Sequence, residues 1–220
     1  NGQKAVRARD VADFEKMYRI INNDPQNEIL WVPAAAVKKI QKARYAEMVL
    51  HEMWCVANLR IKSVEIQGDS AAVRFHNPES RIQFEHPWPR PMVTKDGHNS
   101  AFYLTNAMEL LDEPGEWYHD IESRKIYYYP RKGEKISKAV VPGIETLVWV
   151  EGTIDRPVKH IRFDNVTFQY TTWMRPSLQG HVPLQAGMYM TDGYKIRPSM
   201  IRKNNHKRDN QGWLGRPASA

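Results

Sequence analysis

Two short runs of strand-forming residues around a polar turn constrain the fold of this chain more than any other feature. The first run, residues 116–120, follows a turn at Pro114-Gly115, and the second, residues 125–129, ends at Pro130. Aromatic residues favour strands, whereas glycine and proline favour turns and proline ends a strand. The pattern therefore predicts an antiparallel hairpin whose aromatic side chains cover neighbouring apolar surface.

The part of the chain before this hairpin predicts a small α+β domain, residues 1–95, that consists mostly of antiparallel strands. An apolar face at helical spacing, Phe14, Met17, Tyr18 and Ile21, predicts a helix over residues 10–21. Pro33 suits the first turn of a second helix that runs to Ile40. Alternating apolar residues and intervening turns, one of them at residues 68–69, predict strands at residues 4–8, 29–32, 47–56, 59–67, 72–75 and 81–84.

Beyond the hairpin, apolar residues alternate in three triplets that lie 20 residues apart. The triplets are Thr146, Val148, Val150; Val166, Phe168, Tyr170; and Ala186, Met188, Met190. A period-two pattern that recurs at a fixed longer interval is typical of a β-solenoid. We therefore expect parallel strands over residues 144–190, with Val148, Phe168 and Met188 inside one wall. Residues 96–143 would connect the small domain to these rungs, which would occupy residues 144–220.

The sequence around the hairpin resembles a segment of large bacterial right-handed parallel β-helix proteins, many of which are secreted glycoside hydrolases. The resemblance rests on the order PGEWY and IYYYP, on residues 107–112 before the hairpin and on residues 158–163 after it. It implies a mainly β protein of the pectate-lyase-like fold. The chain would hold the first rungs of a right-handed parallel β-helix, an inserted α+β domain and the antiparallel aromatic hairpin.

The same resemblance implies a function. The chain would be part of a secreted or periplasmic bacterial enzyme that hydrolyses a complex polysaccharide by carboxylate acid/base catalysis. In such proteins the catalytic acids generally lie on later rungs, so we expect a fragment whose catalytic residues are not assigned. Two alternatives stay open. One is a polysaccharide lyase on the same fold, and the other is a non-catalytic carbohydrate-binding or structural module.

Composition narrows the remaining function classes. The net charge of +7 is concentrated between Lys195 and Arg216, where Trp213 and Tyr194 are the aromatic residues near enough to stack a base. We interpret this stretch as a solvated loop and predict no nucleic-acid partner. The single cysteine, Cys55, excludes an internal disulfide and a cysteine-built metal site. No apolar run is long enough to span a membrane, and we predict neither a cofactor nor a metal ion.

The candidate substrate-binding residues are Trp173, His181, Gln185 and Asp192, in and beside a loop rich in proline and glycine. A flat tryptophan face stacks on a sugar, while the three polar side chains can hydrogen-bond its hydroxyl groups. The alternative interpretation is an ordinary loop with a packed tryptophan.

Two other groups of residues are weaker candidates. Residues 51–55 begin like a zinc-protease motif, but Cys55 replaces the second histidine and the stretch is expected to be a strand. Four carboxylates crowd the hairpin, namely Asp112, Glu113, Glu116 and Asp120. Acids beside Pro-Gly turns are usually solvated, so we do not assign them a catalytic role.

Overall fold

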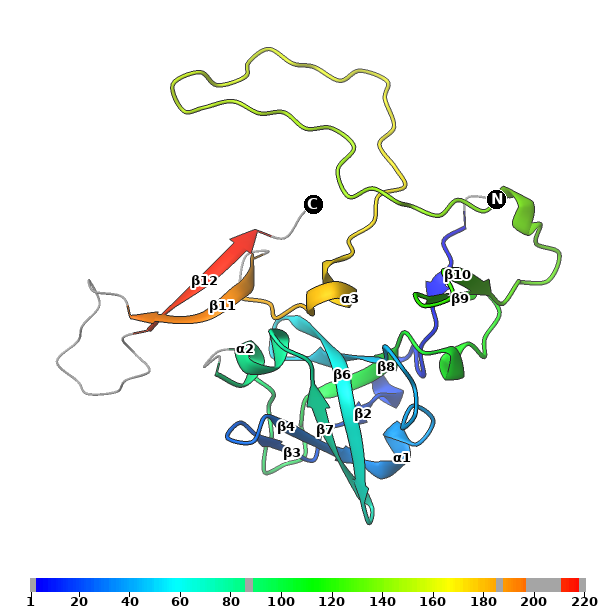
Figure 1. Ribbon diagram of the computed structural model, residues 1–220, viewed down its shortest axis with the longest axis vertical. Coiled ribbons are helices and arrows are strands. Elements are labelled where there is room, and N and C mark those ends of the chain that lie inside the picture. Colours follow the sequence, from blue (N-terminus) through cyan, green and yellow to red (C-terminus); the bar gives the residue numbers. More distant parts are fainter. Residues whose placement is uncertain (1–2, 86–88, 185–187, 197–210, 218–220) are drawn as a thin grey trace. The chain divides into compact units, whose positions relative to one another are not determined.

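The computed structural model divides the chain into two compact units (Figure 1). The first unit holds residues up to 134 together with those from 175 onward, and the second unit is residues 135–174. The residues described are 3–85, 89–184, 188–196 and 211–217.

Seven strands of the first unit form one antiparallel sheet in the order β2-β8-β5-β6-β7-β4-β3. The strands are β2 (Tyr18–Arg19), β3 (Asn22–Asp24), β4 (Ile29–Pro33), β5 (Glu47–His51), β6 (Val56–Gln67), β7 (Ser70–Phe75) and β8 (Ala101–Thr105). The beginning of β6 pairs with β5 and its remainder with β7, and the β6–β7 register shifts between Ile61 and Ser63. Such an irregularity bends a strand, which lets β6 serve two neighbours along its length.

The core lies against one face of this sheet. Met48 and Leu50 of β5, Leu59 of β6, and Phe102 and Leu104 of β8 are fully buried in a single apolar cluster. Side chains alternate between the two faces of a strand, so residues at i and i+2 reach the same core. The predicted strand at residues 29–32 is confirmed as β4, and the predicted turn at residues 68–69 is confirmed between β6 and β7.

Short helices join the strands. They are α1 (Ala34–Val37), α2 (Glu79–Glu85) and α3 (Arg175–Gln179), with 3₁₀ turns η1 (Phe14–Lys16), η2 (Met108–Leu110) and η3 (Ile136–Lys138). The predicted helix after Pro33 is confirmed as α1, which is only four residues long. Val37 and Ile40 at its end are buried in the core, because the chain turns there toward β5.

The aromatic hairpin is confirmed. Strands β9 (Glu116–Asp120) and β10 (Lys125–Tyr128) pair antiparallel, with Tyr118 opposite Tyr127. The short β1 (Val6–Arg7) pairs in parallel with β9 and completes a three-stranded sheet. Only part of the predicted aromatic cover is realised, since Tyr118 is buried in the core cluster while Tyr127 and Tyr129 are exposed.

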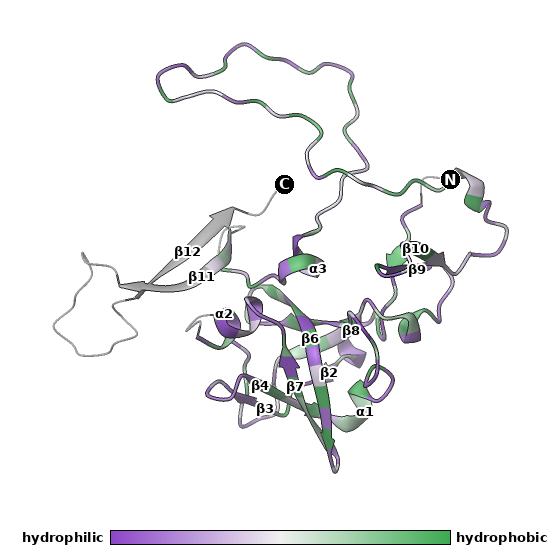
Figure 2. Cartoon of the chain, in the orientation of Figure 1, coloured by the Kyte–Doolittle hydropathy of each residue, from purple (hydrophilic) through white to green (hydrophobic). Residues whose placement is uncertain are grey.

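The predicted right-handed parallel β-helix is wrong. None of the residues 139–174 is in a strand, and the Val148 and Phe168 side chains are 43% and 49% exposed. Met188 lies in β11 (Met188–Ile196), which pairs antiparallel with β12 (Gln211–Pro217). Among the described strands, β1 and β9 alone pair in parallel. Alternating apolar residues therefore occur here without the backbone partners that a solenoid requires, and Figure 2 shows them spread along the open trace of the second unit.

Two shorter predictions are also wrong. Residues 81–84 belong to helix α2, from which Ile82 and Phe84 are buried in the core cluster. The predicted helix over residues 10–21 is replaced by the single turn η1 followed by β2. Of its proposed apolar face, Met17 is buried while Phe14 and Tyr18 are exposed. The predicted domain boundaries at residues 95 and 143 stay a prediction.

Candidate functional site

The face of the sheet opposite the core is polar and aromatic, and we call it the polar face. Its side chains are the alternate ones of β5, β6 and β8, namely Glu47, Val49, His51, Asn58, Arg60, Tyr103 and Thr105. Strand pairing places Glu47 between Thr105 and Arg60, and Val49 between Tyr103 and Asn58. Directly paired residues project to the same face of a sheet. The polar face therefore holds charged and hydrogen-bonding side chains, whereas the core face is apolar.

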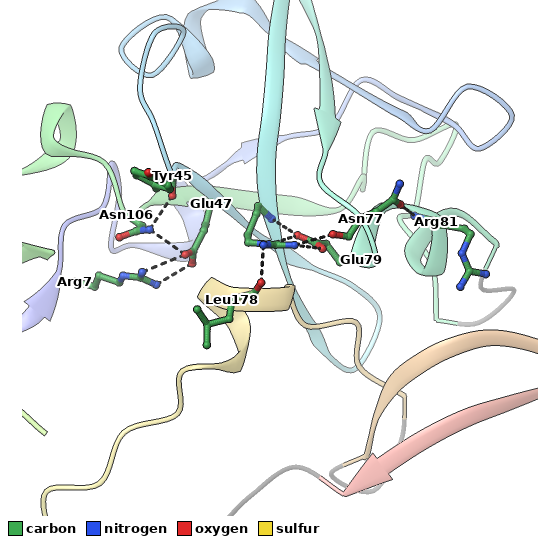
Figure 3. Close-up of polar contacts among 9 residues, drawn as sticks. Arg7, Tyr45, Glu47, Asn77, Glu79, Arg81, Asn106 and Leu178 are labelled. Atoms are coloured by element: carbon green, nitrogen blue, oxygen red, sulfur yellow. Dashed lines mark hydrogen bonds and ion pairs between the residues drawn. The ribbon is translucent and has the colours of Figure 1, made fainter. Parts of the chain in front are cut away.

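Glu47 forms a buried ion pair at one end of the polar face (Figure 3). Arg7 Nη1 and Nη2 donate to its two carboxylate oxygens over 2.8 and 3.1 Å, and Asn106 Nδ2 donates over 3.0 Å. Burial raises the pKa of Glu47, while the Arg7 charge opposes that rise. Arg7 Nη2 also donates to Ser177 Oγ over 2.9 Å, which links β1 to α3.

A second buried ion pair joins Arg60 of β6 to Glu79 of α2 (Figure 3). Arg60 Nε and Nη2 donate to the two oxygens of Glu79 over 2.7 and 2.9 Å. Arg60 Nη1 donates to the carbonyl of Leu178 over 2.6 Å. Gly180, at φ +67°, lies so close that an added Cβ would be 2.4 Å from the Glu79 side chain. Both pairs therefore fasten α3 to the sheet, and a bidentate arginine occupies each carboxylate.

His181 continues the polar face beyond β6. Its backbone forms an antiparallel bridge with Asn58, with N···O distances of 2.7 and 2.8 Å. The imidazole lies 5.8 Å from the Tyr189 ring, and the Arg175 guanidinium lies 4.1 Å from the same ring. Burial lowers the pKa of His181 to about 4, and the Arg175 charge acts in the same direction. The imidazole is therefore neutral at physiological pH and suited to hydrogen bonding.

An aromatic–arginine cluster, which we define as Phe14, Arg19, His51 and Tyr103, forms the other end of the polar face. The His51 ring lies 5.4 Å from Phe14 and 6.1 Å from Tyr103. The Arg19 guanidinium stands 4.7 Å from the centre of the Phe14 ring. Burial lowers the pKa of His51, with Arg19 adding to the effect, and burial raises the pKa of Tyr103. Flat rings beside polar groups suit a ligand that needs both stacking and hydrogen bonds.

A buried carboxyl group lies at the turn that follows β5. Glu52 is 9% exposed, and it accepts hydrogen bonds from Gln83 Nε2 over 2.6 Å and from Cys55 Sγ over 3.4 Å. Burial raises the pKa of Glu52 to about 7 and that of the Cys55 thiol to about 12. Residues 51–55, which begin like a zinc-protease motif, thus form the end of a strand and a turn. The described residues contain no group of three or more side chains arranged to hold a metal ion.

Comparison with known proteins identifies the family of the chain. The family described as "GH141 insertion domain" matches residues 1–131, which is more than half of the sequence. The chain belongs to this family. A solved structure described as "Glycoside hydrolase" is 71% identical, with a TM-score of 0.89, and the match covers 99% of the present chain. The chain spans only 38% of that structure's length. No curated protein matches it.

In this GH141 chain, the predicted substrate-binding residues are found in different settings. His181 lies on the polar face beside Asn58. Trp173 is half-buried and belongs to the second unit. Asp192 lies in β11, and Gln185 lies outside the described residues. Their role in substrate binding stays a prediction.

Three of the four hairpin carboxylates make contacts within the fold. Glu116 is buried and accepts hydrogen bonds from the backbone N–H groups of Arg9, Asp112 and Glu113 over 3.2–3.3 Å. Asp120 accepts from the backbone and hydroxyl of Ser123 in the hairpin turn. Asp112 pairs with Lys39 over 2.9 Å. These contacts stabilise the turns and loops in which the acidic residues lie.

Sequence analysis missed the aromatic–arginine cluster. Phe14 was assigned to the core face of a helix, and Tyr103 was not singled out. The signal that could have found them is alternation. In β5 and β8 the core residues Leu50, Phe102 and Leu104 leave His51 and Tyr103 on the opposite face.

Among the described residues, no helix has both the length and the apolarity to cross a bilayer.

Proposed function

We propose that this chain is the non-catalytic, carbohydrate-contacting part of a larger glycoside hydrolase that acts on a complex polysaccharide. Support comes from membership of the GH141 insertion domain family and from a 71%-identical relative described as a glycoside hydrolase. The chain matches 38% of that relative, which leaves most of its length for other parts. Those other parts of the enzyme would then supply the acid/base carboxylates of hydrolysis.

The observation that carries this proposal is the state of the buried glutamates. Glycosidases use two carboxyl groups about 5–10 Å apart that flank the scissile bond. Among the described residues, Glu47 and Glu79 are held by bidentate arginines, and Glu116 accepts backbone N–H groups. Glu52 has the raised pKa that an acid catalyst needs, but its partners are Gln83 and Cys55 and not a second carboxylate. These four glutamates therefore support the fold.

The polar face supplies the carbohydrate contact in this proposal. Sugars present C–H faces that stack on aromatic rings and hydroxyl groups that accept and donate hydrogen bonds. The aromatic–arginine cluster offers both, and the exposed Phe14 ring is open to solvent. A polymeric substrate cannot cross a membrane, so we also propose that the enzyme works in the periplasm, at the cell surface or outside the cell.

The experiment compares the 220-residue chain with a longer protein that contains it. Both are incubated with a panel of polysaccharides, and reducing-end release and binding are measured. We expect the chain to bind at least one polysaccharide without turnover, and the longer protein to hydrolyse it. Turnover by the chain alone would contradict the proposal. A lyase also releases reducing ends, but it would leave an unsaturated ring at each new non-reducing end, so unsaturated products would indicate a lyase instead.

A further inference from the structure

We propose that the aromatic–arginine cluster, together with Arg9, binds an acidic saccharide, with a sugar carboxylate on the guanidinium groups and the sugar ring against the aromatic side chains. This inference rests on the proposed function, because it specifies which carbohydrate the polar face takes. The ligand class is a saccharide that carries uronate groups.

The aromatic half of the site is preorganised. Phe14 is the first residue of the turn η1. Asp13 caps this turn, because its Oδ1 accepts the backbone N–H of Glu15 over 3.1 Å. Met17, immediately after that turn, is buried and anchors it. The Phe14 ring is nevertheless 44% exposed, although it contacts His51 edge-on. An aromatic ring that is fixed yet open to solvent loses little entropy when a sugar stacks on it.

The cationic half of the site has two arginines without an acidic partner. Arg19 Nη1 donates to the carbonyl of Asn99 over 3.4 Å, and Arg9 is held opposite Thr105 by a backbone bridge. Among the described residues, neither guanidinium takes part in an ion pair. Because Arg9 and Thr105 are paired, Arg9 projects to the same face as Tyr103. Two guanidinium groups thus border one aromatic surface.

The nearby acids do not cancel this positive charge. Glu47 is matched by Arg7. Asp10 accepts the backbone N–H of Leu104 over 2.8 Å, and Glu116 accepts that of Arg9 over 3.3 Å, so backbone N–H groups offset part of both charges. The cluster therefore favours an anion. A planar guanidinium also matches a carboxylate in a bidentate geometry that a hydroxyl group cannot provide, which gives selectivity for uronates over neutral sugars.

The test is calorimetric titration of the full chain at low salt with a tetramer of galacturonic acid and, as the neutral probe, a tetramer of xylose. We expect the acidic tetramer to bind about tenfold more tightly, in line with a charge-assisted hydrogen bond. High salt should remove most of that difference, since the site is exposed. Phe14→Ala and Arg19→Gln should each weaken the acidic tetramer by about tenfold, and Arg19→Lys by less.

Two control variants separate binding from folding. Arg74→Gln removes an exposed arginine of β7 that, like Arg19, donates to a backbone carbonyl. Tyr129→Ala removes an aromatic ring of similar exposure beside the hairpin. Neither should change the affinity, and circular dichroism should show all variants folded. Equal affinity for the two tetramers, or Arg19→Gln without effect, would overturn the inference and leave the proposed function standing. If no carbohydrate binds at all, both are contradicted.

Discussion

Residues 47–51 and residues 146–150 are both short runs rich in strand-forming apolar residues, yet only the first is a strand. In β5, Met48 and Leu50 are fully buried between β6 and β8. In the second unit, Trp149 is 76% exposed and, a few residues on, Ile154 is 96% exposed. The difference is that β5 has a backbone partner on each side.

This contrast shows what a run of strand-forming residues does and does not determine. It predicts which side chains would share a face if a strand formed, but the strand itself needs partners for its N–H and C=O groups. Among residues 139–174, the backbone hydrogen bonds are local, such as the pair between Thr153 and Arg156, apart from one from Thr172 N to Ile144 O. The sheet and the second unit should therefore respond differently to the same kinds of change.

The largest difference is expected for truncation of an apolar side chain. Phe102→Ala removes a fully buried ring from β8 and should lower the free energy of unfolding by about 3–5 kcal/mol. Phe168→Ala removes the same atoms from a half-exposed side chain of the second unit and should change it by about 0.5 kcal/mol or less. Urea denaturation followed by tryptophan fluorescence measures both. Similar losses for the two variants would show that residue 168 is packed as tightly as the sheet.

The next largest difference concerns ion pairs. Glu79→Ala removes a buried carboxylate and leaves the partly buried Arg60 without its partner, which should destabilise the chain by about 3 kcal/mol. Asp164→Ala breaks the Arg162–Asp164 pair of the second unit, where both side chains are largely exposed, and should have no measurable effect. Thermal unfolding of the two variants at equal salt compares them. A Glu79→Ala protein as stable as the wild type would show that the Arg60–Glu79 pair does not stabilise the fold.

The smallest difference is a pH dependence that originates in the sheet region. The pKa of Glu52 rises from an ordinary value of 4.5 to about 7 on folding, so the folded state binds this proton more tightly. Its contribution to stability is full below pH 4.5 and is lost as the pH rises through about 7. Glu52→Gln should remove that loss, and the gain over wild type should grow between about pH 5 and 8.

His181 complicates the wild-type curve but not this comparison. Its pKa falls to about 4, so its contribution is full above pH 6.5 and is lost as the pH falls toward 4. The readout is therefore the difference between Glu52→Gln and wild type at each pH. Glu151→Gln, in the second unit, is the matched control for removal of one negative charge. A constant difference between Glu52→Gln and wild type would show that Glu52 titrates alike in the folded and unfolded states.

The sequence predicted elements whose signal is local. The hairpin at residues 116–129 carries its own turn, its aromatic residues and its terminating proline, so it was predicted correctly. The strand at residues 29–32 and the helix after Pro33 were found for the same reason. Residues 81–84 were misassigned because Ile82 and Phe84 fit either a strand or a helix, and the choice depends on packing against distant residues.

The candidate site was less predictable because it is assembled from separate segments. Phe14, His51 and Tyr103 come from η1, β5 and β8, and only the sheet pairing brings them together. His181 was singled out from its loop composition, but its place beside Asn58 depends on a bridge between segments far apart in the sequence. The solenoid prediction failed for the complementary reason, since the 20-residue spacing implied stacking between segments that do not pair.

Hydrogen–deuterium exchange of the full chain, with and without the galacturonic acid tetramer, tests the central claim most directly, because one experiment reports on both regions. We expect slow exchange in β5, β6 and β8 and rapid exchange over residues 139–174. The ligand should slow exchange further at residues 14–19 and 101–105 and leave residues 139–174 unchanged. Ligand protection confined to residues 139–174, with none at the aromatic–arginine cluster, would contradict the account.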